Sequence, residues 1–435
     1  MNTRIIEALK KLEIKEYIIN EKVTETAELF FVKKSLDVRR MKDSHLYQVT
    51  LYREFMQGEK KCKGNAVATV YPGMGAEELE KTLETAYLAA SFVANAWYEL
   101  PDCKNEPAPE YQPAEKLSKA SMEESCRIMT EALFAEDTGE AEDEPFINSA
   151  ELFIVSERVR IITSAGADLS YAKKKVNGEF VVQCKAPQDV ESYKDFEYKD
   201  LMADELRKKV KRTLEYTKAR AQATLAPAAG KYNVIISGGY MRTLFDYYLD
   251  RSSAFYVYAG YSSFKTGNNI QFTKENESYG GDPISLTLKA DLPYSSEAIP
   301  MKDRVLMDKG ELKTIYGNAR FSYYLGTEPT GNYSDISVEA GSLSMDEMKK
   351  EPYLHVVNFS DFQMDSLTGH FGGEIRLAFL YDGEKEIPVT GGSINGSIFD
   401  VQGNMRLSCE MQEENGYSGP FAVYMKGVNV AGSEA

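Results

Sequence analysis

Histidine is scarce in this chain, and its scarcity limits the metal chemistry that the chain can carry. The three histidines are His45, His355 and His370, and no two of them lie within one turn of helix of each other. A peptidase zinc site takes three protein ligands, typically two from one face of a helix, and leaves one position open for the water that it activates. The sequence therefore argues against a zinc site built around a histidine pair.

Cysteines and long apolar runs are also few. The five cysteines are odd in number, scattered and never spaced Cys-x-x-Cys; they are Cys62, Cys103, Cys126, Cys184 and Cys409. Such a set forms no disulfide framework and fits a reducing compartment. The opening residues, MNTRIIEALKKLEIKEY, lack the apolar core of a signal peptide, and no apolar run reaches the roughly 18 residues of a membrane helix. We therefore expect a cytoplasmic protein that does not associate with a membrane.

Positive charge is in deficit as well. The formal net charge is -16, from 51 Lys and Arg against 67 Asp and Glu. Nucleic-acid backbones and anionic membranes attract positively charged proteins, so the charge predicts neither of them as a partner.

The common motifs for nucleophilic catalysis and nucleotide binding are missing. The chain has no Gly-x-Ser-x-Gly, and the glycine-rich segment 390–396 follows a strand-like run and precedes no helix, so we interpret it as a turn. Gly-x-x-x-x-Gly-Lys and Gly-x-Gly-x-x-Gly are also absent. A Ser/His/Asp arrangement assembled from distant segments stays open, because such triads are defined by geometry.

The chain does have a well-marked strand, turn and helix between residues 230 and 250. Residues 232–236, YNVII, are apolar and β-branched, which predicts a buried strand. Ser237, Gly238 and Gly239 then break the pattern, and from Tyr240 the apolar residues recur at the spacing of one helix face. A strand that turns through two glycines into a helix holds the side chains at the helix start rigidly, as many enzyme sites require.

The remaining pattern predicts an α+β fold in two domains. Before residue 226, helical patterns alternate with strand-like runs, and after it short strands separated by glycine-containing turns dominate. We expect residues 1–225 to form a domain of antiparallel strands with helices, and residues 226–435 to form a β-rich domain. The helices are expected at 1–20, 76–98, 121–134 and 201–223, the last being basic and interpreted as a solvated face; strands are expected at 27–33, 36–42, 46–56 and 62–71, and turns at Gly166-Ala167 and Asn177-Gly178.

Residues 230–250, 325–332 (LGTEPTGN), 358–360 (NFS) and 388–396 (PVTGGSING) resemble the TldD/PmbA family, also called modulator of DNA gyrase. TldD-type members carry a His-Glu-x-x-x-His motif on the helix here, whose histidines hold a catalytic zinc. The motif falls on Ser237, Gly238 and Arg242 of this chain, and none of these is His or Glu. Cys409 lies near the position of the family's cysteine ligand, and we interpret it as an ordinary thiol. The chain is therefore more similar to the PmbA (TldE-like) branch, which lacks the zinc motif.

The resemblance implies a subunit that shapes a peptide tunnel in a complex that degrades or matures unfolded or modified peptides. Its partner would be a like-folded TldD-type subunit that brings zinc, while this chain needs no cofactor of its own. From the tyrosine-rich region after residue 239 we select four candidates for the peptide groove; these are Tyr240, Arg242, Tyr247 and Tyr258. The family's gyrase label does not predict DNA binding.

Two alternatives stay open. One is a self-sufficient peptidase with a non-standard site, which would cleave peptides alone and in the presence of chelators. The other is a homodimeric peptide-binding protein without a proteolytic partner.

Overall fold

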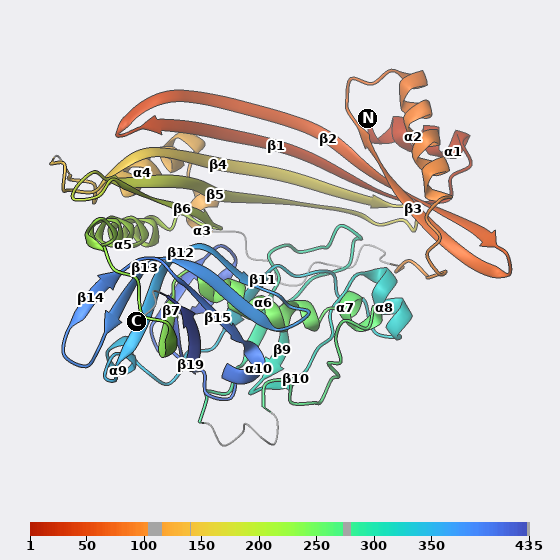
Figure 1. Cartoon of the computed structure of the whole chain (residues 1–435). Helices are drawn as coiled ribbons and strands as arrows, with labels where there is room; N and C mark the ends of the chain where they lie inside the picture. The colour runs from red at the N-terminus through yellow and green to blue at the C-terminus, as the bar shows by residue number, and fades with distance from the viewer. Residues whose placement is uncertain (103–114, 140, 273–279, 433–435) are drawn as a thin grey trace.

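The computed structural model describes residues 1–102, 115–139, 141–272 and 280–432, so Cys103 lies outside it. A long, curved antiparallel sheet from the first half of the chain lies over a β-rich body from the second half (Figure 1). The predicted α+β fold, with an antiparallel first part and a β-rich second part, is confirmed. None of the helices in the described ranges is long and apolar enough to cross a membrane.

The first sheet has longer strands than the sequence pattern predicted. The described residues give six strands in the order β3-β2-β1-β4-β5-β6. The helix expected over 1–20 ends at Lys11, and the runs expected at 27–33, 36–42 and 46–56 belong to just two strands, β1 and β2. Residues 35–44 are exposed on both faces of the sheet. Their sequence therefore lacks the alternation of apolar and polar residues that would have predicted one continuous strand. The strands are β1 Glu16–Val32, β2 Ser35–Gln57, β3 Lys60–Val70, β4 Phe146–Thr163, β5 Asp168–Cys184 and β6 Val190–Tyr198.

The hairpin predicted at Asn177-Gly178 is wrong, because both residues lie in the middle of β5. A Cβ on Gly178 would lie 2.2 Å from the carbonyl oxygen of Glu151 and 2.7 Å from the ring of Phe196. The glycine therefore marks a close approach of Phe196, its neighbour on β6, and not a turn. The turn predicted at Gly166-Ala167 is confirmed and joins β4 to β5.

Within the described ranges five helices accompany this sheet; they are α1 Asn2–Lys11, α2 Ala76–Ala90, α3 Glu115–Lys119, α4 Met122–Phe134 and α5 Ala203–Gln222. In Figure 1, α1 and α2 cover one end of the sheet, and α5 lies between the other end and the second part of the chain. Ser121 caps α4 as predicted, since its Oγ accepts the N–H of Glu124 at 3.1 Å. The helix predicted over 76–98 ends at Ala90 because the next residues turn to pair with β3, through Lys63 N–H to Asn95 O at 3.0 Å.

The second part contains two sheets that share one apolar core. In the described residues β12, β7, β19, β15 and β13 form a closed ring, because β12 also pairs with β13, and β10-β9-β8-β11-β18-β17 form a second sheet. Helix α6 packs its buried face into the core between them. The strands are β7 Gly230–Ser237, β8 Leu286–Lys289, β9 Arg304–Asp308, β10 Glu311–Leu312, β11 Asp335–Val338, β12 Tyr353–Met364, β13 His370–Tyr381, β14 Glu386–Val389, β15 Ser393–Ser397, β16 Arg406–Leu407, β17 Met411–Glu414, β18 Tyr417–Pro420 and β19 Ala422–Ala431. The helices are α6 Tyr240–Arg251, α7 Ala254–Tyr258, α8 Ala319–Leu325, α9 Met345–Met348 and α10 Ile398–Val401.

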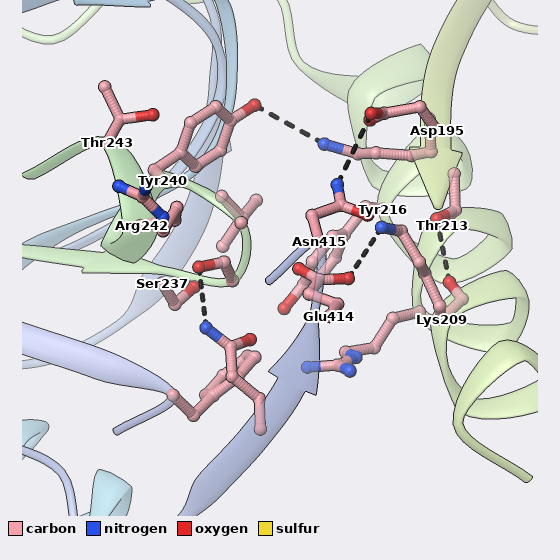
Figure 2. Close-up of a pocket in the computed structure, with 17 residues that line it drawn as sticks. Asp195, Lys209, Thr213, Tyr216, Ser237, Tyr240, Arg242, Thr243, Glu414 and Asn415 are labelled. Atoms are coloured by element: carbon pink, nitrogen blue, oxygen red, sulfur yellow. Dashed lines mark hydrogen bonds and ion pairs between the residues drawn. The ribbon is translucent and has the colours of Figure 1, made fainter. Parts of the chain in front are cut away.

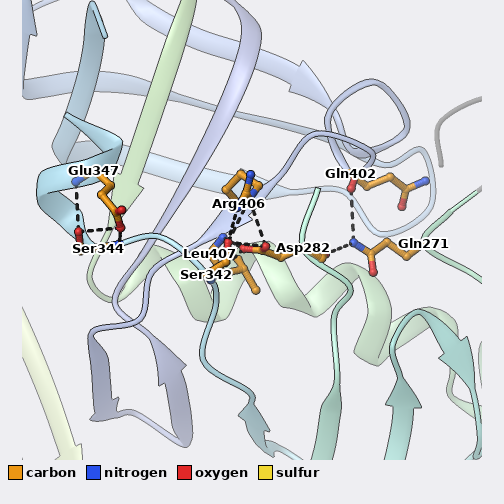
Figure 3. A network of polar contacts seen from close by, with 8 residues as sticks. All are labelled: Gln271, Asp282, Ser342, Ser344, Glu347, Gln402, Arg406 and Leu407. Carbon is orange, nitrogen blue, oxygen red and sulfur yellow. Dashed lines mark hydrogen bonds and ion pairs between the residues drawn. The ribbon is translucent and has the colours of Figure 1, made fainter. Parts of the chain in front are cut away.

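A buried carboxylate ties distant segments of this part together (Figure 3). Oδ1 of Asp282 accepts from Ser342 Oγ at 2.6 Å and from Arg406 Nε at 3.1 Å, and Oδ2 accepts from the N–H of Leu407 at 2.7 Å. The carbonyl oxygen of Asp282 also accepts from the Gln271 side chain at 2.8 Å. Donors from two segments thus satisfy the carboxylate, which offsets the cost of its burial.

Candidate functional site

A cavity of about 330 Å³ lies between the two parts of the chain. Strand β6 and helix α5 form one wall, and the β7–α6 turn, β12 and β17 form the other. In Figure 2 the side chains of Lys209 and Thr213 come from α5 and face Tyr240 and Arg242 at the start of α6. The volume falls in the range of small-ligand sites, and the location between two packed parts of a protein is a common one for such sites.

The glycines of the β7–α6 turn give the cavity its floor. Gly238 has a φ of 76°, a left-handed conformation that glycine adopts without strain, and its N–H donates to the carbonyl of Phe421 at 2.9 Å. A Cβ on Gly239 would lie 3.2 Å from Oε1 of Glu414, so the missing side chain lets this carboxylate approach the turn. The turn therefore brings Ser237 and Tyr240 to the cavity from two different elements.

Ser237, the last residue of β7, forms a buried pair with His355 of the parallel neighbour β12. Its Oγ lies 2.8 Å from Nε2 of His355, and both residues are 3% exposed. Burial, with a smaller contribution from the charge of Lys349, lowers the pKa of His355 to about 3, so the imidazole is neutral at physiological pH. The Nδ1 atom of His355 has no hydrogen-bond partner among the described residues.

This arrangement favours a hydroxyl donor over an activated nucleophile. A buried N–H without an acceptor is less favourable than a bare ring nitrogen without a donor, so the proton of His355 belongs on Nε2, where it donates to Ser237. A serine nucleophile instead needs Nε2 bare to take its proton, and an acceptor such as a carboxylate at Nδ1. His355 therefore orients Ser237, whose own O–H is left to donate toward the cavity.

Tyr240 is a rigid aromatic wall of the cavity. Its hydroxyl accepts from the N–H of Phe359 at 2.9 Å, donates to Oδ1 of Asn358 at 3.3 Å and lies 3.4 Å from Nζ of Lys194. Its ring packs edge-on against Phe359 with the centroids 4.8 Å apart. These contacts fix the ring before any ligand binds, which reduces the entropy lost on binding.

The charged groups of the cavity divide into paired and unpaired cations. Lys209 is paired with Glu414, Nζ to Oε2 at 2.6 Å, and Arg242 with Asp246 on the next turn of α6. Lys194 and Arg212 have no carboxylate partner in the part of the chain that the structure describes. The guanidinium of Arg212 instead lies over the ring of Phe421, 4.6 Å from its centroid.

The three positions assigned to the lost zinc motif line this cavity, but they do not share a helix. Ser237 ends β7, Gly238 lies in the turn and Arg242 lies in the first turn of α6. Glycine has no ligand side chain, and arginine stays protonated and only donates hydrogen bonds. No group of three or more His, Cys, Asp or Glu side chains within the described ranges is placed to hold a metal. Zinc therefore does not fit the residues at these positions.

Cys409 lies outside the cavity, on the surface after β16. Its Sγ lies 3.7 Å from Oε2 of Glu410. Desolvation and the charge of this carboxylate raise the pKa of the Cys409 thiol, which keeps it protonated and makes it a weaker ligand and nucleophile.

The cavity brings together two of the four residues selected for a peptide groove, Tyr240 and Arg242. Tyr247 is 1% exposed and packs in the core against Tyr248, Phe264 and Phe399. Tyr258 is 48% exposed and contacts Phe321 and Tyr324 on a different surface. Neither of them lines the cavity.

Sequence reasoning missed most of the lining outside the β7–α6 turn. These side chains come from β6, α5 and the end of β17; they include Lys194, Lys209, Arg212, Tyr216, Glu414 and Asn415. The one available signal was the basic face of the helix predicted over 201–223, which we interpreted as solvated. Part of that face lines the cavity.

Comparisons with known proteins agree with the fold. The family model described as "PmbA/TldA metallopeptidase C-terminal domain" matches residues 229–432. The structure is similar to TldE from Thermococcus kodakarensis, with a TM-score of 0.76 and 15% identity over 99% of each chain. Structures described as modulators of DNA gyrase are also similar: that of Thermotoga maritima has a TM-score of 0.76 at 15% identity, and that of Bacteroides thetaiotaomicron 0.74 at 16%, each covering 99% of both chains.

A search of curated protein sequences found no match to the chain. At 15–16% identity the likeness to solved structures shows the fold, and the family model adds a match at the level of sequence. This match begins one residue before β7 and includes the β7–α6 turn that forms the floor of the cavity. Residues 229–432 thus match the C-terminal domain of the PmbA/TldA metallopeptidases in sequence, and the whole chain has the fold of TldE and of the modulator structures.

Proposed function

We propose that the chain is a PmbA/TldE-like subunit that binds peptides without cleaving them, within a cytoplasmic complex that degrades or matures unfolded or modified peptides. The observation that carries this proposal is the chemistry of the β7–α6 turn. Where the resemblance to TldD-type members predicts metal ligands, this chain has a serine, a glycine and an arginine around a cavity. These residues can bind a polar chain but cannot hold the zinc that would activate water.

The cavity offers what an extended peptide requires. Tyr216, Tyr240 and Phe421 supply flat apolar area, and Ser237 supplies a hydrogen-bond donor among them. Because the cavity lies between the two parts of the chain, both contribute to recognition of the same ligand.

The partner in this proposal is a like-folded TldD-type subunit that provides the zinc. A second copy of this chain is the alternative partner, and it would give a homodimeric peptide-binding protein without proteolytic activity. Neither arrangement includes nucleic acid or a membrane, since the net charge is -16.

The test compares the purified chain alone, a TldD-type protein from the same organism alone, and the two mixed, each with a fluorogenic unfolded peptide. We expect no cleavage by this chain alone, and cleavage by the mixture that EDTA abolishes. Size-exclusion chromatography with light scattering then shows whether the two chains co-elute or this chain elutes as a homodimer. Cleavage by this chain alone, whether or not EDTA stops it, would contradict the non-catalytic proposal.

A further inference from the structure

The cavity is a positively charged site on an acidic protein. Among the described residues that line it, four are Lys or Arg and two are Asp or Glu, although the whole chain carries a net charge of -16. Partly enclosed cationic walls concentrate their field in the cavity, so an anionic group is favoured there over a neutral one.

The pairing of these charges identifies the cation that is available. Lys209 forms an ion pair with Glu414, and Arg242 forms one with Asp246. Nη2 of Arg242 also donates to the carbonyl of Ser334 at 2.8 Å. Cζ of Arg212 lies over the ring of Phe421, 4.6 Å from its centroid. This cation–π contact holds the guanidinium in place, and without a carboxylate partner among the described residues its N–H donors are available to a planar anion such as a carboxylate.

The neighbouring groups favour a carboxylate attached to an apolar chain. Lys194 adds a second positive charge from β6, where its Nζ lies over the ring of Tyr240 at 5.2 Å from the centroid. Ser237 is held by His355 with its hydroxyl at the cavity, and Tyr216 and Val357 add apolar surface. A free inorganic anion would leave these apolar walls in contact with water, whereas the end of a peptide would cover them.

We propose that the cavity captures the free C-terminal carboxylate of a peptide whose last side chain is apolar, with Arg212 as its ion-pair partner. This inference rests on the proposed peptide-binding function and adds an orientation to it. A peptide held by its C-terminus presents the bonds upstream of that end to the rest of the complex. The chain would therefore act as a carboxyl-end clamp that selects peptides with an exposed terminus.

The test uses three fluorescein-labelled peptides of six residues. The first has five alanines and a C-terminal phenylalanine with a free carboxylate, the second is its C-terminal amide, and the third is an amide that carries a glutamate next to the phenylalanine. Fluorescence anisotropy with the full-length chain measures the three affinities. We expect the free acid to bind about tenfold or more tightly than either amide, because a hydrogen-bonded charge pair is lost in both.

The variant Arg212→Gln should lower the affinity for the free acid by about tenfold and leave that for the plain amide unchanged. Lys211→Gln is the matched control, since Lys211 is an exposed residue on the same helix that does not line the cavity. Thermal melting of both variants checks that each is folded.

The outcomes separate the clamp from the peptide-binding function. Equal binding of acid and plain amide, unaffected by Arg212→Gln, overturns the clamp and leaves peptide binding standing. Tight binding of the glutamate-containing amide that depends on Arg212 overturns the terminal assignment, because the cavity would then recognise an acidic side chain. Binding of none of the three peptides, by the chain alone or mixed with a TldD-type partner, overturns both proposals.

Discussion

Lys209 of α5 and Glu414 of β17 form an ion pair that joins the two parts of the chain at the edge of the cavity. Nζ of Lys209 lies 2.6 Å from Oε2 of Glu414, and the two side chains are only 12% and 13% exposed. The residues are 205 positions apart in the sequence. Because Oε1 of Glu414 also lies against Gly239, the pair fixes α5 relative to the β7–α6 turn.

Removing one member of this pair should destabilise the protein more than removing both. Glu414→Leu leaves the ammonium of Lys209 largely buried without a partner, and we expect it to lower the free energy of unfolding by about 3 kcal/mol. The double variant Lys209→Met, Glu414→Leu replaces the pair by apolar groups and should recover most of that loss. Urea denaturation of the single and double variants measures both effects.

The exposed pair Lys208–Glu205 on the same helix is the control. Lys208→Met should change stability little, because solvent screens this pair. A double variant at 209 and 414 that is no more stable than Glu414→Leu alone would show that the ion pair itself is not what these side chains contribute.

The depressed pKa of His355 predicts how stability depends on pH. The folded state keeps His355 neutral down to a pKa of about 3, whereas in the unfolded chain it becomes protonated below its ordinary pKa of 6.5. The unfolded state therefore binds more protons between these two values, and stability must fall as pH falls through this window. We expect about 2 kcal/mol of loss from this residue between pH 7 and pH 5.

The measurement is the free energy of unfolding from urea titrations at pH 7, 6 and 5, for the native chain and for His355→Gln. Other titrating groups contribute equally to both proteins, so the difference between the two curves isolates His355. The variant should be less stable than the native chain at pH 7 but should lose less stability on acidification. Parallel curves would mean that the pKa of His355 is the same in the folded and the unfolded protein.

Short-range features of the fold were predictable, and long-range ones were not. The strand and helix around residues 230–250 were predicted correctly, because their apolar periods and the two glycines between them are local signals; they are β7 and α6. The helix expected to reach Tyr98 ends at Ala90, because pairing with β3 determines the conformation of the residues that follow. No local pattern carries information about such pairing.

In the candidate site, too, the residues of one local segment were predictable and those brought together by the fold were not. Ser237, Gly238, Tyr240 and Arg242 belong to one continuous segment, and the sequence singled out all four. The rest of the lining comes from elements that only the folded chain brings near this segment, as Lys209 and Glu414 show. The tyrosines show why local sequence could not identify the site completely. Both Tyr240 and Tyr247 belong to the same tyrosine-rich segment, yet Tyr240 lines the cavity and Tyr247 lies in the core.

A substitution at Gly178, which lies within β5 where the sequence predicted a hairpin, should destabilise the protein. Gly178→Ala would place a methyl group against the carbonyl oxygen of Glu151, a backbone atom that cannot move without disturbing β4. We expect a loss of about 3 kcal/mol, at the upper end of the cost of overpacking. The control is Gly73→Ala, since a Cβ on Gly73 would meet no atom within 4 Å. Equal melting temperatures for the two variants would contradict the close approach of strands at residue 178.

The last prediction concerns zinc in the purified chain. The residues at positions 237, 238 and 242 offer no metal ligand beyond one buried hydroxyl, and Cys409 is a lone exposed thiol. Elemental mass spectrometry of protein prepared without chelators should therefore find far less than one zinc per chain. Cys409→Ala should leave the melting temperature unchanged, and EDTA should leave that of the native chain unchanged. About one zinc per chain, with a fall in melting temperature on adding EDTA, would contradict the proposal. It would also make a self-sufficient metallopeptidase the leading hypothesis, because a stoichiometric metal that supports the fold needs several protein ligands.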